Sequence, residues 1–134
     1  MLVELLQNGY GNEQKLNCAQ KILFASNEAF QLGLSDDALS LAGGFGGGMA
    51  IENSCGALTA GVMVLSKLFP GTDEDSKTRL RSLTKELLTT YEAKMGHIDC
   101  APLKKEYRND EIGCKNIIIE AAKILESIVE RELK

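Results

Sequence analysis

The residues of this sequence best suited to chemistry are its four cysteines, Cys18, Cys55, Cys100 and Cys114. The chain begins without a basic leader, and no segment approaches the roughly 18 apolar residues that a membrane span requires. We therefore expect a cytoplasmic protein that makes no use of a membrane. In that reducing compartment, thiols more often bind metal or carry out redox chemistry than form permanent disulfides.

The spacing of the cysteines narrows this chemistry. No two of them form a C-x-x-C pair, which counts against a thioredoxin-like motif, a bacterial ferredoxin run and a zinc ribbon. Cys55, Cys100 and Cys114 fall at the starts of predicted helices, where backbone N–H groups and the helix dipole favour a thiolate. Cys18 instead falls on the inward face of a predicted helix. We expect a thiol of lowered pKa in this group, with Cys55 as the first candidate.

The elements that must position these thiols are all helical. Apolar residues recur at helical spacing, and strand signals are weak because aromatic residues make up only 5% of the chain. The sequence predicts one all-α domain, residues 1–134, built as a bundle of about five to six helices. The predicted helices cover residues 12–32, 35–42, 55–69, 73–95, 100–107 and 114–133.

The last of these helices has a well-defined apolar side and is expected to be central to the bundle. That side carries Cys114, Ile117, Ile118, Ala121, Leu125, Ile128 and Val129. Small residues in the helix of Cys55 allow another backbone to approach closely, and such faces also leave a homo-oligomer open.

A glycine-rich stretch from Gly43 to Gly48 lies shortly before Cys55 and is predicted to be a loop, because glycine is unfavourable inside a helix. A phosphate-binding interpretation is weak, since no G-K-[ST] follows and the G-x-G-x-x-G spacing fails at Met49. Two interpretations remain open for this loop: close backbone approach beside Cys55, or a flexible connector. The single histidine, His97, is expected to be a solvated loop residue rather than a ligand.

The charge of the chain limits its partners. The net charge is −4, and Lys and Arg are scattered among acidic residues, so nucleic acid is not an expected partner. For a thiol protein the expected partner is instead an unidentified redox protein or a small thiol.

Several motifs together resemble a known family. They are Asn17-Cys18-Ala19-Gln20, then Gly44-Phe45-Gly46-Gly47-Gly48-Met49, then Cys55-Gly56-Ala57-Leu58-Thr59-Ala60-Gly61, and finally the separate Cys100 and Cys114. This order resembles the C_GCAxxG_C_C family of redox-active proteins, small prokaryotic proteins of about this length. The resemblance covers essentially the whole chain and implies that the four cysteines act together. Beside the cysteines, Gly46, Gly47, Gly48 and Gly56 are the candidates for holding a cofactor.

Three functions remain open at this point. The first is a thiol redox protein, which could be a thiol oxidoreductase, that exchanges electrons through a disulfide. The second is an electron-transfer module in which the four thiolates hold an iron–sulfur cluster or zinc, since a similar domain in split-Soret cytochromes is associated with an iron–sulfur site. The C-x-x-C-H of c-type haem attachment is missing, so haem is not expected. The third is a helical scaffold with inert buried cysteines.

Overall fold

The computed structural model describes residues 1–134, which form seven α-helices and no β-strand. In order these are α1 (Leu2–Gln7), α2 (Cys18–Ala29), α3 (Asp36–Ser40), α4 (Gly56–Leu68), α5 (Glu74–Met95), α6 (Cys100–Tyr107) and α7 (Lys115–Glu132). The all-α prediction is confirmed, with one helix more than the five to six expected. No helix combines the length and the apolar character needed to cross a membrane.

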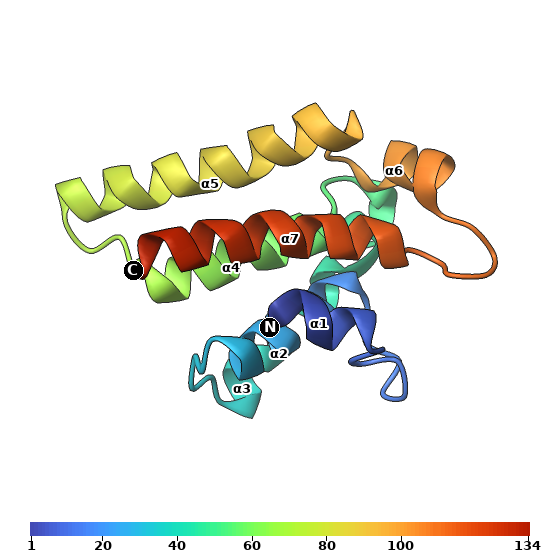
Figure 1. The fold of residues 1–134 in the computed structure, drawn as a ribbon, viewed down its shortest axis with the longest axis horizontal. Helices are drawn as coiled ribbons and strands as arrows, with labels where there is room; N and C mark the ends of the chain where they lie inside the picture. Colours follow the sequence, from blue (N-terminus) through green and yellow to red (C-terminus); the bar gives the residue numbers. More distant parts are fainter.

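Three long helices form the centre of the molecule. Helices α4, α5 and α7 pack against one another, while α2 packs on α4 and α1 packs between α2 and α7 (Figure 1). The predicted apolar side of α7 is confirmed, since every residue assigned to it from Ile117 to Val129 is buried. Gly61 of α4 shows why a small residue is needed there, because a Cβ atom at that position would lie 2.9 Å from Leu87 of α5.

Helix α5 has the boundaries that the sequence predicts. The Asp73 carboxylate accepts a hydrogen bond from the Ser76 N–H, and the Ser76 hydroxyl in return accepts one from the Asp73 N–H. At the other end, Gly96 takes the left-handed conformation that ends many helices. Both signals lie within a few residues of the boundary, so they can be read directly from the sequence.

The first predicted helix, 12–32, is wrong at its N-terminal end. Residues 8–15 form turns, and α2 begins at Cys18 because the Asn17 side chain accepts a hydrogen bond from the Gln20 N–H. The additional helix α1 has only six residues, too few to show a helical period. Its first N–H groups are capped by Glu126 of α7, with Leu2 N–H to Glu126 Oε2 at 2.6 Å, a contact between opposite ends of the sequence.

The glycine-rich stretch is irregular, as the sequence predicts, but it is not featureless. It contains a 3₁₀ turn at Gly43–Phe45 and a wider turn at Gly48–Glu52. Gly47 and Gly48 both have left-handed backbone angles, and so do the non-glycine residues Met49 and Ala50 that follow them. Four such residues in succession turn the chain sharply back toward the start of α4.

Candidate functional site

All four cysteines border one cavity, whose volume is about 340 Å³. Cys18 and Cys100 are the first residues of α2 and α6, and Cys55 and Cys114 immediately precede α4 and α7. The prediction that three cysteines lie at helix starts is confirmed. The position predicted for Cys18 is corrected: it lies at a helix start too, because α2 begins at Cys18 and not near residue 12. Four helices therefore present their N-termini to the same cavity.

A short antiparallel bridge brings Cys55 and Cys100 together. Ser54 pairs with Asp99, although the two residues belong to distant parts of the chain. The Cys55 N–H donates to the Ile98 carbonyl oxygen at 2.8 Å, and the Cys100 N–H donates to the Asn53 carbonyl oxygen at 2.6 Å. These two backbone hydrogen bonds fix the starts of α4 and α6 next to each other.

Cys18 can lie against the start of α4 because Gly56 has no side chain. Gly56 follows Cys55, and a Cβ atom on it would lie 2.6 Å from the Cys18 Sγ atom and 2.7 Å from the Phe45 carbonyl oxygen. Such distances are too short for any side chain, so glycine is required for the Cys18 sulfur to lie beside Cys55. The small residue in the C-G-A sequence is therefore part of the geometry of the site.

The glycines of the loop also allow a close approach of the backbone beside the cysteines. A Cβ atom on Gly46 would lie 2.4 Å from the Asn17 side chain, and one on Gly48 would lie 2.8 Å from the Cys100 Cβ atom. Gly47 borders the cavity itself. In addition, the Asn17 amide donates to the Gly43 carbonyl oxygen at 3.0 Å, which ties the loop to the start of α2. Of the two interpretations of this loop, close backbone approach beside the cysteines is the one that the structure supports.

The expectation of a lowered pKa at Cys55 is wrong. Burial and, to a smaller extent, the neighbouring Cys18 together raise the pKa of the Cys55 thiol to about 12, while the N–H groups of Ala57 and Leu58 oppose the change. The side chain is only 3% exposed, so the loss of hydration outweighs the start of the helix. Burial likewise raises the pKa of Cys100, against the opposing charge of Lys104.

Exposure separates the cysteines into two kinds. Cys55 and Cys100 are buried, whereas Cys18 and Cys114 are half-buried. The half-buried pair is therefore the more accessible to a molecule that enters the cavity. Of all side chains, Cys18 has the largest electrostatic influence on Cys55, and Cys100 has a smaller one.

Four positive side chains and no carboxylate border the cavity, a feature that the sequence reasoning missed. They are Lys21, Lys104, Arg108 and Lys115. A signal was present, because Lys21 and Lys104 each lie about one helical turn after a cysteine and so share its face. His97 does not border the cavity and lies 3.4 Å from the Glu106 carboxylate instead.

The donor set does not fit a single metal ion. No three side chains of the His, Cys, Asp and Glu types lie close enough together to hold one. The zinc alternative therefore has no ligand set in this conformation.

The fold and the site together define the chain as an all-helical domain with four thiols around one cavity. A family model described as "Putative redox-active protein (C_GCAxxG_C_C)" matches residues 16–128, and the chain belongs to this family. The matched range contains all four cysteines and the glycine-rich stretch. In comparisons with curated proteins and with solved structures, nothing matches the chain.

Proposed function

We propose that the protein is a thiol redox protein that forms and reduces a disulfide between Cys18 and Cys55. The observation that carries the proposal is that all four cysteines border one cavity. A scaffold with inert thiols would give no reason for helices from distant parts of the chain to place every cysteine at one site. The close packing of the Cys18 sulfur on Gly56, next to Cys55, favours this pair over the other connectivities.

The difference in exposure assigns the two roles. The half-buried Cys18 attacks the incoming disulfide as a thiolate, one sulfur of that disulfide leaves as a thiol, and a mixed disulfide remains on Cys18. Cys55 then attacks the Cys18 sulfur and releases the second thiol. In sum, two cysteine thiols become one disulfide, and the two electrons reduce the substrate disulfide to two thiols.

The electrostatics of the pair support this order. The negative charge of Cys18 is one of the causes that raise the pKa of Cys55. Once the Cys18 sulfur is part of a mixed disulfide it can no longer carry that charge, so the pKa of Cys55 falls at the step in which Cys55 must act. The N–H groups of Ala57 and Leu58 then stabilise its thiolate.

Counting free thiols after mild oxidation and again after reduction tests the proposal. We expect the count to fall from four to two on oxidation and to return to four on reduction. Peptide mapping should locate the disulfide at Cys18 and Cys55, and Cys114→Ser serves as the control that still forms it. Four free thiols under both conditions, or a disulfide that forms equally well in Cys18→Ser, would contradict the proposal.

A four-thiolate iron–sulfur cluster is the second candidate. The observation that favours it is again the shared cavity, since a cluster of several iron atoms spaces its thiolates further apart than one ion does. Anaerobic purification and reconstitution, followed by visible absorption and iron analysis, tests this candidate. A colourless, iron-free protein after both steps would exclude it, and each of the four Cys→Ser variants should reduce the iron content if it holds.

A further inference from the structure

The positive charge around the cavity is largely left without a carboxylate partner. Lys104 lies 3.4 Å from Glu52, but Lys21 and Lys115 form no ion pair and donate only to neutral oxygens. Their acceptors are the Asn12 side-chain oxygen at 2.8 Å and the Gln7 carbonyl oxygen at 3.2 Å. Arg108 forms no ion pair either. In a chain of net charge −4, such a concentration of positive charge at one cavity calls for an explanation.

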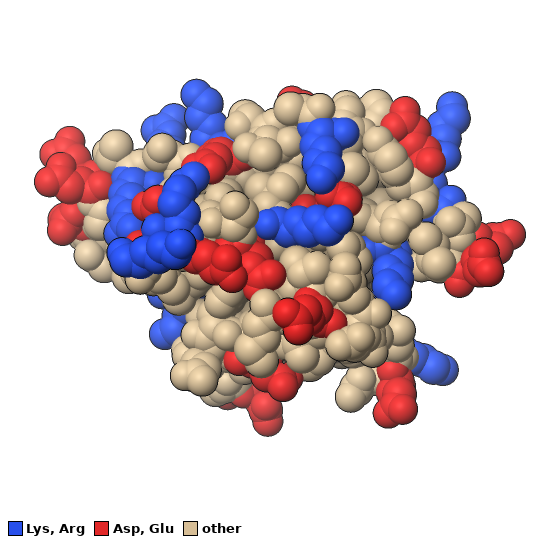
Figure 2. Space-filling view, in the orientation of Figure 1, with Lys and Arg blue, Asp and Glu red and all other residues tan.

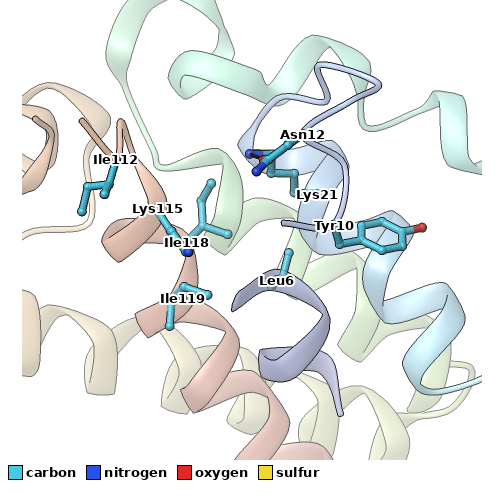
Figure 3. Close-up of a pocket in the computed structure, with 8 residues that line it drawn as sticks. All are labelled: Leu6, Tyr10, Asn12, Lys21, Ile112, Lys115, Ile118 and Ile119. Atoms are coloured by element: carbon cyan, nitrogen blue, oxygen red, sulfur yellow. Dashed lines mark hydrogen bonds between the residues drawn. The ribbon is translucent and has the colours of Figure 1, made fainter. Parts of the chain in front are cut away.

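Two of the four cations, Lys21 and Lys115, also border a space that contains no thiol. A second, smaller pocket of about 60 Å³ adjoins the cavity, between α1, α2 and the start of α7 (Figure 3). Lys21, Ile112, Lys115 and Ile118 border both spaces. The smaller pocket has no cysteine in its lining, and its floor includes the apolar side chains of Leu6 and Ile119. Lys21 and Lys115 therefore lie where the cavity continues beyond the sulfur atoms.

We propose that the substrate is a small disulfide, or the corresponding thiol, that carries carboxylates, and that Lys21 and Lys115 bind a carboxylate beyond the sulfur atoms. The inference rests on the proposed function, because it names the substrate class of the same cysteines. A volume of about 340 Å³ lies in the range of small-molecule sites, which begins at roughly 300 Å³. A small molecule thus fits this space, with its sulfur at the half-buried thiols and its charged end toward the smaller pocket.

The exchange is balanced without a further co-reactant. Two protein thiols and one small disulfide give one protein disulfide and two small thiols, and the two protons pass from the protein thiols to the leaving thiolates. The lysines take no part in bond making. Their role is to position the substrate, because they bind its carboxylate equally well before and after the exchange.

Three small disulfides of different charge test the inference. They are oxidised glutathione, which is anionic, hydroxyethyl disulfide, which is neutral, and cystamine, which is cationic. Each is mixed with the fully reduced protein, the rate of thiol loss is measured, and the rate is divided by that of free dithiothreitol with the same disulfide. We expect the anionic disulfide to be favoured over the neutral one by about tenfold, equivalent to ~1.4 kcal/mol. The cationic one should be the slowest.

Substitutions at the lysines then identify the source of the preference. The double variant Lys21→Gln with Lys115→Gln should lose most of the tenfold preference, measured as the ratio of its normalised rates with the anionic and the neutral disulfide. Lys67→Gln, an exposed lysine in the last turn of α4, is the matched control and should change neither rate. Lys67 lies at the end of α4 remote from Cys55.

The outcomes separate the two proposals. If all three disulfides react at equal normalised rates, or if Lys67→Gln lowers the preference as much as the double variant does, the inference is overturned while the proposed function stands. If no disulfide oxidises the protein, the proposed function fails and the inference fails with it. A preference that disappears in 1 M salt supports the inference, since screening removes exposed ion pairs first.

Discussion

The two ends of the helical bundle carry similar positive side chains in opposite surroundings. At the end where α7 finishes, Arg131 donates two hydrogen bonds to the Glu86 carboxylate at 2.7 and 2.8 Å, and Arg79 lies 3.2 Å from Glu132. On the face drawn in Figure 2, positive and negative atoms are interleaved at that end. At the opposite end, where α7 begins, the cavity lining contains four cations and no carboxylate.

This difference shows how the same residue type takes on different roles. Paired charges at the far end neutralise each other at the surface, where such pairs contribute little to stability. Around the cavity, positive charge that no carboxylate of the chain neutralises stays available to thiolates and to a ligand. The far end is a solvated surface, whereas under the proposed function the cysteine end is organised around a ligand.

The largest effect is expected from Gly48→Ala at the cysteine end. A Cβ atom there would lie 2.5 Å from the backbone N and O atoms of Asn53, which cannot move aside as a flexible side chain can. The left-handed backbone at this position adds a further cost. We expect a loss of about 3 kcal/mol in the free energy of unfolding, from overpacking and backbone strain together. Urea unfolding of the reduced protein measures it.

The matched control lies four residues earlier in the same loop. A Cβ atom on Gly44 would meet no neighbouring atom within 4 Å, and the backbone there is not left-handed, so Gly44→Ala should leave stability unchanged or raise it slightly. Equal losses in the two variants would contradict the idea that close approach to Asn53 and Cys100 sets the requirement for glycine.

Sequence reasoning located three of the four cysteines at helix starts, because the signals at helix ends are local. Asp73 and Gly96 determine α5 within a few residues, and its predicted boundaries are confirmed. The predicted start of α2 was wrong because Asn12 and Asn17 are equally good N-cap residues by residue type. Only the reciprocal hydrogen bonds with Gln20 and the contact with Gly43 decide for Asn17, and the second of these depends on the folded loop.

The chemistry of the site was harder to predict than its location. The pKa of Cys55 was expected to fall from its place at a helix start, whereas burial raises it, and burial is a property of the packed molecule. The spacing of Lys21 and Lys104 from a cysteine was a signal in the sequence, but the meeting of Lys21 and Lys115 at one pocket depends on packing. Lys115 and Lys21 come from different helices, and nothing in the sequence shows that they border the same pocket.

The next effect concerns the reactivity of the buried thiol. Because the pKa of Cys55 is raised from 9.0 to about 12, its thiolate is scarce at pH 8. A thiolate of higher pKa is also the stronger nucleophile, which offsets part of this scarcity. We expect its alkylation rate to be about 30-fold or more below that in the unfolded chain. Iodoacetamide labelling with peptide mapping, with and without urea, measures this ratio. The half-buried Cys114 is the internal control and should be slowed less.

The same pKa predicts how stability depends on pH on the alkaline side. A raised pKa means that folding favours the protonated thiol, so this contribution is fully present below pH 9 and is lost as the pH rises toward 12. Cys55→Ala should remove this part of the alkaline loss. An unchanged alkaline limb in that variant would show that Cys55 is not desolvated in solution.

Two capping boxes, one at each end of the bundle, allow a smaller and more specific comparison. Asn17 caps α2 beside the cavity, and Asp73 caps α5 at the far end. Asn17→Ala should cost about 1 kcal/mol in unfolding free energy, the usual cost of a lost cap. It should also change the labelling rate of Cys18, the next residue. Asp73→Ala should lower stability without changing that rate, and a change in both variants would point to a general loosening instead.

The smallest effect is expected at the far end itself, from Arg131→Gln. The Arg131 side chain is half exposed to solvent, so the loss of stability should be smaller than that of Asn17→Ala. The Arg131 guanidinium lowers the pKa of Glu86 below its ordinary value of 4.5. The contribution of the pair is therefore present above pH 4.5 and is lost as the pH falls further, so variant and unmodified protein should converge in acid. Urea unfolding at pH 7 and at pH 3 measures this. The positive charge that Arg131→Gln removes is paired with a carboxylate of the chain itself. The normalised rate with an anionic disulfide should therefore stay the same in this variant, whereas Lys115→Gln should alter it.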